Sequence, residues 1–335
     1  MASMQNVQGS ASSLGALRAR WLLVLLLVCG ALVAPFALHK FYVFQMTLVL
    51  IYAISILGLN LLVGFNGQLS LGHGAFFALG AYTAAMLIEH VGLNYALTLP
   101  IAAVICFIFG FLFGLPALRL DGIYLALATF ALSVATPQIL KLSVIEKWTG
   151  GVQGLIVTKP DAPLGLPLTP DQWLYFLTLS VAMLAYWVAV NLVASRTGRA
   201  LRSVRDNPLA ATAMGVNTAY YKTLAFGVSG AYTGVAGALS AIVVQFVAPD
   251  SFTLSLSIAM LVGLVVGGVG WLPGAIFGAA FILLVPNVAE GISKGLAGAV
   301  YGVMMIVLML LLPSGVSTPV QWVQRRFKAW TNAAR

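Results

Sequence analysis

The segment FYVFQMTLVLIYAISILGLNLLVGFNGQLSLGHGAFFALGAYTAAMLI, residues 41–88, contains no Asp, Glu, Lys or Arg. A helix needs about 20 apolar residues to cross the hydrocarbon core of a bilayer, so this segment is long enough for two crossings. Glycines interrupt it repeatedly between residues 64 and 74, where we expect a Gly-broken helix. Such a break at membrane depth is tolerated only when it is buried in protein or lines a cavity.

The rest of the chain has the same character. Of its 335 residues, 61% are hydrophobic and only 7% are charged, whereas soluble domains carry roughly a quarter charged residues. The sequence therefore predicts an all-α polytopic membrane protein. We expect about ten transmembrane helices, near residues 21–39, 43–64, 75–88, 97–117, 122–140, 172–194, 223–246, 253–270, 273–289 and 296–312.

Glycines spaced four residues apart predict where these helices approach closely, because small residues let helix backbones meet. The pairs are Gly110/Gly114, Gly230/Gly234, Gly263/Gly267, Gly274/Gly278 and Gly298/Gly302.

The charged residues orient the chain. With the N-terminus in the cytoplasm, the cytoplasmic segments hold twelve of the seventeen basic residues against two acids, and the outer segments hold five basic residues against six acids. The positive-inside rule favours this orientation, with both termini cytoplasmic. The basic excess is thus explained by topology, and no nucleic-acid partner is expected. Neither Cys29 nor Cys106 has a neighbour at metal-ligand spacing, so we expect no metal site.

This topology divides the chain into three parts. Residues 1–20 form a cytoplasmic tail, residues 21–312 a transmembrane domain, and residues 313–335 a basic cytoplasmic tail. We expect the first span to be retained rather than cleaved as a signal peptide, because its uncharged run is longer than a usual signal sequence. The longest outer connection, residues 141–171, is rich in glycine and proline.

The cytoplasmic connection, residues 195–222, contains start and stop signals for a helix. Asp206 or Asn207 can cap its N-terminus, and Pro208 suits the first position because no amide donor is needed there. Gly215 is a suitable C-terminal stop.

The pattern thus predicts a short exposed helix at residues 208–214. Ala210 and Ala211 would give it a small surface suited to a groove on a partner protein. A solvated basic loop near anionic membrane lipid would explain the preceding arginines but not these signals. The arginines that could add charge pairs to the partner are Arg199, Arg202 and Arg205.

Several motifs, in order along the chain, resemble those of one family. They are Gly67–Phe77 (GQLSLGHGAFF), Gly122–Thr129 (GIYLALAT), Thr149-Gly150-Gly151 with Gly154-Leu155, Leu209-Ala210-Ala211-(three residues)-Gly215, and Gly267–Gly270 with Pro273-Gly274. Together they resemble the permeases of branched-chain amino acid ABC transporters, in the LivM-like branch. Leu209 replaces the glutamate of the general coupling motif of such permeases, and Trp271 stands where a small or polar residue is expected.

The resemblance implies a heteromeric importer in the bacterial inner membrane. Its expected partners are a second homologous permease subunit, two cytoplasmic ATPases and an extracytoplasmic solute-binding protein. The chain is then not itself an enzyme, has no catalytic residues and needs no cofactor, since ATP would be bound by the partner subunits. In agreement, the sequence has no Gly-x-x-x-x-Gly-Lys-Ser/Thr loop. The segment that contacts the ATPases would include Asp206, Asn207, Pro208, Ala210, Ala211 and Gly215.

Polar groups within membrane spans are candidates for the substrate pathway. The strongest cluster surrounds the expected break and comprises Asn60, Asn66, Gln68, Ser70 and His73. The alternative interpretation is that these groups only hydrogen-bond neighbouring helices.

Two questions of function remain open at this stage. Branched-chain amino acids are the expected solute, but urea or aromatic acids would suit the same architecture. An ion-coupled secondary transporter is the alternative from another class. A proton carrier of that class would place an acid or a lysine within a span, whereas the eight acids here lie at segment ends or in loops.

Overall fold

The computed structural model describes residues 30–120, 122–162, 167–292, 302–307, 310 and 315–316. The predicted tail at residues 1–20 lies outside these residues, as does all of the predicted tail at residues 313–335 except 315–316. Residues 21–29 of the first expected span and most of the tenth also lie outside them. The prediction that both termini are cytoplasmic therefore falls outside the described part of the chain.

Within the described residues, seven helical segments are long and apolar enough to cross a membrane, and each corresponds to a predicted span. The helices are α2 (Lys40–Leu59) continued by the π-helix η1 (Asn60–Gly64), α3 (His73–Val91), α4 (Tyr95–Ala117), α5 (Ile123–Leu140), α7 (Pro170–Ala194), α10 (Thr218–Val244), and η3 (Pro249–Ser251) with α11 (Leu254–Gly267). The ninth predicted span is α12 (Gly274–Ile292), whose apolar part is shorter. The chain is thus a mostly helical, multi-pass membrane protein.

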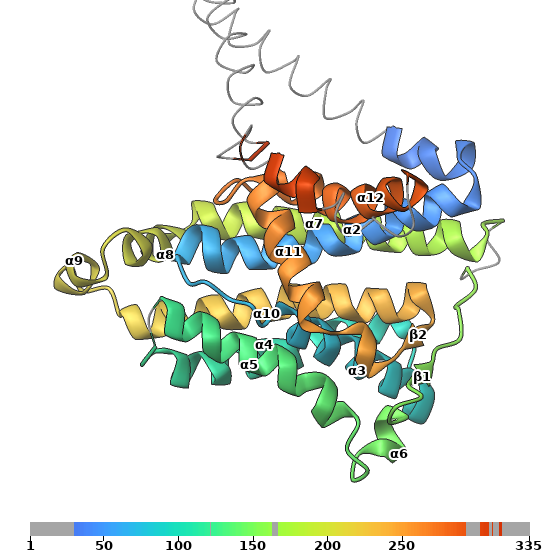
Figure 1. Ribbon diagram of the computed structural model, residues 1–335, viewed down its shortest axis with the longest axis horizontal. Helices are drawn as coiled ribbons and strands as arrows, with labels where there is room; N and C mark the ends of the chain where they lie inside the picture. Colours follow the sequence, from blue (N-terminus) through green and yellow to red (C-terminus); the bar gives the residue numbers. More distant parts are fainter. Residues whose placement is uncertain are drawn as a thin grey trace, which may run out of the picture.

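Helix α10 is the centre of the bundle and packs against α4, α3 and α2 (Figure 1). Glycines make this possible: a Cβ on Gly80 would overlap the carbonyl of Gly234, and a Cβ on Gly110 would overlap that of Phe226. Helices α11 and α12 meet in the same way at Gly263 and Gly278. The packing role predicted from glycine spacing is therefore confirmed for four of the five pairs. Of the fifth, Gly298 lies outside the described residues, and a Cβ on Gly302 would meet no atom of the described residues within 4 Å.

Two short helices, α8 (Arg196–Asp206) and α9 (Pro208–Ala213), lie at one end of the bundle. The opposite end carries α6 (Glu146–Thr149) and an antiparallel pair of two-residue strands, β1 (Leu155–Ile156) and β2 (Phe246–Val247) (Figure 1). The connections expected inside and outside the membrane thus lie at opposite ends of the molecule.

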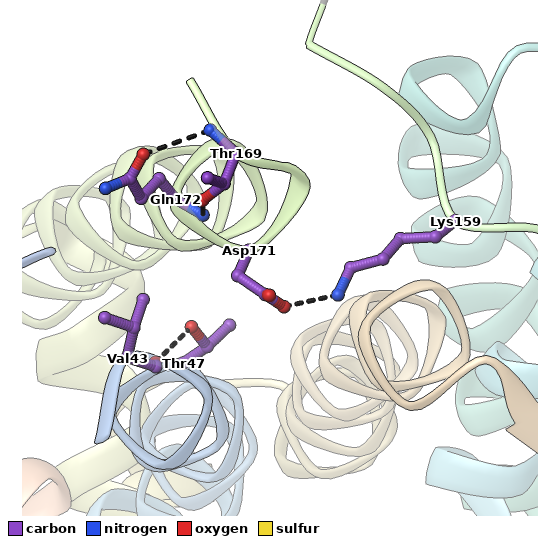
Figure 2. A network of polar contacts seen from close by, with 6 residues as sticks. All are labelled: Val43, Thr47, Lys159, Thr169, Asp171 and Gln172. Carbon is purple, nitrogen blue, oxygen red and sulfur yellow. Dashed lines mark hydrogen bonds and ion pairs between the residues drawn. The ribbon is translucent and has the colours of Figure 1, made fainter. Parts of the chain in front are cut away.

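The long connection before α7 is anchored to that helix (Figure 2). Lys159 forms an ion pair with Asp171 in the first turn of α7. Thr169 and Gln172 form a reciprocal capping box, in which Thr169 N donates to Gln172 Oε1 at 3.0 Å and Gln172 N donates to Thr169 Oγ1 at 3.4 Å. These contacts fix where α7 begins at this end of the bundle.

Candidate functional site

The expected break in the helix is present. The chain leaves helical geometry after Asn66, is non-helical over residues 67–72, and becomes helical again at His73. Gly67 has a φ of +75°, a conformation that favours glycine. The prediction of a Gly-broken helix near residues 64–74 is confirmed.

The new helix begins inside the bundle rather than at its surface. The first residue of α3, His73, contacts Ser229 of α10, and Ser229 lies eleven residues after Thr218, where α10 begins. At 1.5 Å per residue this places the start of α3 about 16 Å from the α9 end of α10. The segment between Gly64 and His73 therefore leads from one end of the bundle into its interior.

A directed chain of hydrogen bonds holds the start of α3. Ser229 Oγ donates to Gly58 O at 2.7 Å, so it accepts from His73 Nε2 at 2.7 Å. His73 Nδ1 then accepts from Ser70 Oγ at 3.2 Å, and Ser70 Oγ accepts from Gly72 N at 3.2 Å. This assignment gives a neutral imidazole with its proton on Nε2. Every polar atom of the His73 ring thereby has a partner.

A second chain of hydrogen bonds holds the non-helical backbone. Ser133 Oγ of α5 donates to Leu71 O at 2.6 Å and accepts from Ser257 Oγ of α11 at 2.9 Å. Ser257 Oγ accepts from Gly74 N at 2.8 Å. Thr129 Oγ1 accepts from Leu71 N at 2.9 Å. Backbone groups that the break leaves without helical partners are thus satisfied by side chains of two other helices.

These four hydroxyl residues, Thr129, Ser133, Ser229 and Ser257, were not identified from the sequence. The signal available was a hydroxyl inside an apolar span, which is shared by many residues that bond only their own helix. All four are at most 1% exposed.

Asn60 joins the π-helix to the turn after α11. Its Nδ2 donates to Trp271 O at 3.0 Å and its Oδ1 accepts from Gly270 N at 2.8 Å. The side chain is fully buried, so both hydrogen-bonding groups of its amide are used in packing two segments of the same chain together.

Asn66 and Gln68 lie at the end of the break nearer α8. Asn66 Nδ2 donates to Gln68 Oε1 at 2.5 Å, and both side chains are buried. Asn66 Oδ1 is buried without a hydrogen-bond partner. The five predicted pathway residues therefore lie along one continuous segment, and Asn66 Oδ1 is the atom among them that leaves an acceptor free.

The arginines of residues 195–207 lie on a helix, α8, which precedes α9 and was not predicted from the sequence. Gly198, Leu201 and Val204 are buried on one face of α8 at helical spacing. Arg202 Nη2 donates to Val193 O at 2.6 Å, and its guanidinium lies 5.8 Å from the Phe65 ring centroid. Arg205 Nη1 donates to Gly64 O at 2.7 Å. Arg199 is exposed, and its Nη1 donates to Ala194 O at 3.4 Å. All three arginines expected to face a partner thus also contact their own chain.

The short helix predicted at residues 208–214 is confirmed as α9, Pro208–Ala213. Asn207, not Asp206, caps it, because Asn207 Oδ1 accepts from Ala210 N at 3.0 Å. Asp206 instead pairs with Arg205 at 2.8 Å. Gly215 follows the helix with a φ of +82°.

The surface that α9 presents differs from the expected one. Ala211 is only 4% exposed, because α9 packs against α8 and α10, whereas Leu209 is 84% and Met214 85% exposed. Ala210 and Ala213 are exposed beside them. The outward surface is therefore formed by Leu209, Ala210, Ala213 and Met214, and Ala211 faces inward.

In the described part of the chain, no group of three or more His, Cys, Asp or Glu side chains is placed to hold a metal ion. Cys106 of α4 is a buried free thiol that lies against Gly234 of α10, and its Sγ donates weakly to Phe76 O of α3 at 3.7 Å.

Residues 41–309 match the protein family described as branched-chain amino acid transport system / permease component. The chain is 36% identical over 286 residues to the high-affinity branched-chain amino acid transport system permease protein LivM of Escherichia coli (strain K12), covering 78% of this chain and 66% of that protein. It is 34% identical over 272 residues to LivM of Salmonella typhimurium (strain LT2), covering 74% and 64%. It thus spans just under two thirds of the length of both relatives.

A more distant relative is named for a different substrate. The autoinducer 2 import system permease protein LsrC of Salmonella paratyphi B is 27% identical over 278 residues, covering 79% of this chain and 77% of that protein. No solved structure matches the chain.

Proposed function

The chain belongs to the family of branched-chain amino acid ABC transporter permeases, and from that premise we propose that it forms half of the membrane pathway of an importer driven by separate ATPase subunits. The observation that carries the proposal is the surface of α9. Leu209 in α9 and Met214 at its C-cap are large apolar side chains that are more than four fifths exposed, and the start of the helix is capped. Such a helix suits a hydrophobic groove on a partner protein.

We further propose that α9 docks on a cytoplasmic ATPase. The α8 end of the bundle is then cytoplasmic, as the basic residues of this end favour. The end that carries α6 and the β1–β2 pair faces outward, where residues 141–171 offer a docking surface for a solute-binding protein. The membrane domain spans residues 21–312 with about ten helices, a cytoplasmic tail on each side of it, and lies in a bacterial inner membrane.

The solute we propose is a branched-chain amino acid, in accordance with the LivM relatives. The LsrC relatives are permeases of an import system that is named for another substrate. Urea and aromatic acids remain alternatives for this chain. The deciding measurement is the solute that the matching binding protein retains when it is purified with the complex. Retention of leucine, isoleucine or valine supports the proposal, and retention of another solute overturns the substrate assignment.

The docking surface is tested by Ala210→Trp. Because Ala210 is exposed, the larger side chain leaves the bundle intact but keeps the helix out of a fitted groove by steric overlap. We expect the variant to lose most of the ATPase that co-purifies with the wild-type complex. A tryptophan at the exposed Val152, at the opposite end, is the matched control and leaves ATPase retention unchanged. Wild-type retention and ATP hydrolysis in Ala210→Trp would show that α9 is not the docking element.

A further inference from the structure

Arg205 connects the segment carrying α9 to the break in the membrane helix. Its Nη1 donates to Gly64 O at 2.7 Å, while Asp206 Oδ1 accepts from its Nε at 2.9 Å and lies 2.8 Å from its Nη2. The guanidinium therefore bridges the last residue of η1 and the last residue of α8.

The carbonyl that Arg205 holds is available because the helix breaks there. In a continuing α-helix, Gly64 O would accept from the amide of Gln68. That amide donates instead to Leu62 O at 3.2 Å. An arginine from another helix thus replaces the lost helical donor.

Gly64 is also the point where a third segment meets the break. A Cβ on Gly64 would lie 2.6 Å from the amide nitrogen of Gly270, so the two backbones touch. Beside it, the Arg205 side chain lies across Gly67, where a Cβ would come 2.7 Å from Arg205 Cγ. The contacts of Arg205 therefore reach η1, the non-helical segment and, through Gly64, the turn after α11.

Helix α8 also contacts this region through apolar packing. Its buried Leu201 packs in a cluster with Leu62 of η1, Ala117 of α4 and Leu125 of α5. Its end is joined to α9 by a single residue, since Asn207 ends α8 and caps α9. No flexible loop therefore separates α9 from α8.

We propose that Arg205 is a positioning residue that couples α9 to the broken segment, so that movement of the docked ATPases displaces residues 64–72. The inference rests on the proposed function, because it requires ATPases docked at α9. Membrane helices respond to a cytoplasmic partner only through rigid contacts, and the Arg205–Gly64 hydrogen bond is such a contact at the start of the break. The segment it would move leads directly to the buried network around His73.

The test is the ratio of solute transported to ATP hydrolysed in proteoliposomes containing the full complex. Arg205→Ala removes the donor to Gly64 O, and we expect this ratio to fall about tenfold, the loss typical of one charged hydrogen bond. Arg205→Lys can still donate to Gly64 O and restores most of the ratio. Arg196→Ala, at an exposed position in the first turn of α8, is the matched control and keeps the wild-type ratio.

The outcomes separate this inference from the proposed function. A wild-type complex that neither retains ATPases nor transports solute with ATP overturns the proposed function. A working wild-type complex whose ratio is unchanged in Arg205→Ala overturns only the role of Arg205. A parallel fall in transport and hydrolysis, without rescue by lysine, likewise overturns it and indicates a role in folding alone.

A second measurement does not depend on the stability of Arg205→Ala. Leu69 is 48% exposed within the non-helical segment. We expect the thiol labelling rate of Leu69→Cys, with both native cysteines replaced, to change about fivefold when a non-hydrolysable ATP analogue traps the complex. If the complex transports solute but the labelling rate is the same with and without the ATP analogue, the break does not move with the ATPases.

Discussion

At the scale of single residues, hydroxyl groups explain how a non-helical segment persists inside an apolar bundle. A serine or threonine hydroxyl both donates and accepts, so it can pass hydrogen bonds from one helix to the next. Ser133 and Ser257 do this between Leu71 O and Gly74 N. Because an unsatisfied buried polar group costs about 1–3 kcal/mol, the break is stable only with such partners.

His73→Leu tests the first hydrogen-bond chain. The variant leaves the Ser70 hydroxyl without its acceptor and Ser229 without its incoming donor, so we expect the free energy of unfolding in detergent to fall by about 2–4 kcal/mol. His39→Leu, at an exposed position before α2, is the control and leaves the stability unchanged. Equal unfolding curves for His73→Leu and wild type would contradict the assigned network.

Gln68→Leu tests the pathway hypothesis at the residue that is the most exposed of the five, at 6%. Gln68 shares its amide oxygen with Asn66, the residue that has a free buried acceptor. If this pair contacts the solute, replacing an amide by an apolar group should lower uptake about tenfold or more, because polar groups of the solute and of Asn66 lose their partner. The measurement is initial uptake at equal amounts of assembled complex. Wild-type uptake would assign the pair to packing.

At the scale of elements, the features that were predicted correctly are those marked by signals close together in the sequence. The helix at residues 208–214 was found because Asn207, Pro208 and Gly215 mark its ends within a few residues of one another. The break near residues 64–74 was found because glycines are concentrated there. The helical state of residues 196–206 was missed because the arginines were interpreted by charge alone, although Gly198, Leu201 and Val204 have helical spacing.

Contacts between distant elements could not be predicted from one sequence. His73 and Ser229 are separated by 156 residues, and Gly74 and Ser257 by 183. Nothing within either span indicates the register in which the helices pack. The burial of Ala211 could not be predicted for the same reason, since it depends on how α9 lies against α8 and α10.

The α3–α10 contact yields a prediction for a pair of elements. Gly80→Ala places a methyl group against the carbonyl of Gly234, and the two helices must separate to accept it. We expect the free energy of unfolding to fall by about 1–3 kcal/mol, the usual cost of overpacking. Gly302→Ala, at a helical glycine where an added Cβ meets no atom of the described residues within 4 Å, should not lower the stability. A stable Gly80→Ala variant would show that this interface is not closely packed.

At the scale of the whole molecule, the two ends of the helix bundle differ both in their connecting elements and in their charge. Six of the basic residues predicted to be cytoplasmic lie in the described part of the chain, and the element bounds and contacts put all of them at the α8 end: Arg119, Arg196, Arg199, Arg202, Arg205 and Lys222. The opposite end pairs lysines with acids, as in Lys141 with Asp250 at 2.5 Å and Lys159 with Asp171. Excess positive charge is thus concentrated at the α8 end, the end that the positive-inside rule assigns to the cytoplasm.

This asymmetry predicts which positions a membrane-impermeant thiol reagent can reach. Met214 and Val144 are 85% and 87% exposed at opposite ends of the bundle, so local burial protects neither. In right-side-out vesicles that contain the permease without its ATPases, Val144→Cys should be labelled and Met214→Cys should not, and in inside-out vesicles the order should reverse. The native cysteines are replaced in both variants, and detergent-solubilised protein, in which both positions react, is the control. Labelling of Met214→Cys from outside would invert the orientation and remove α9 from the reach of a cytoplasmic ATPase.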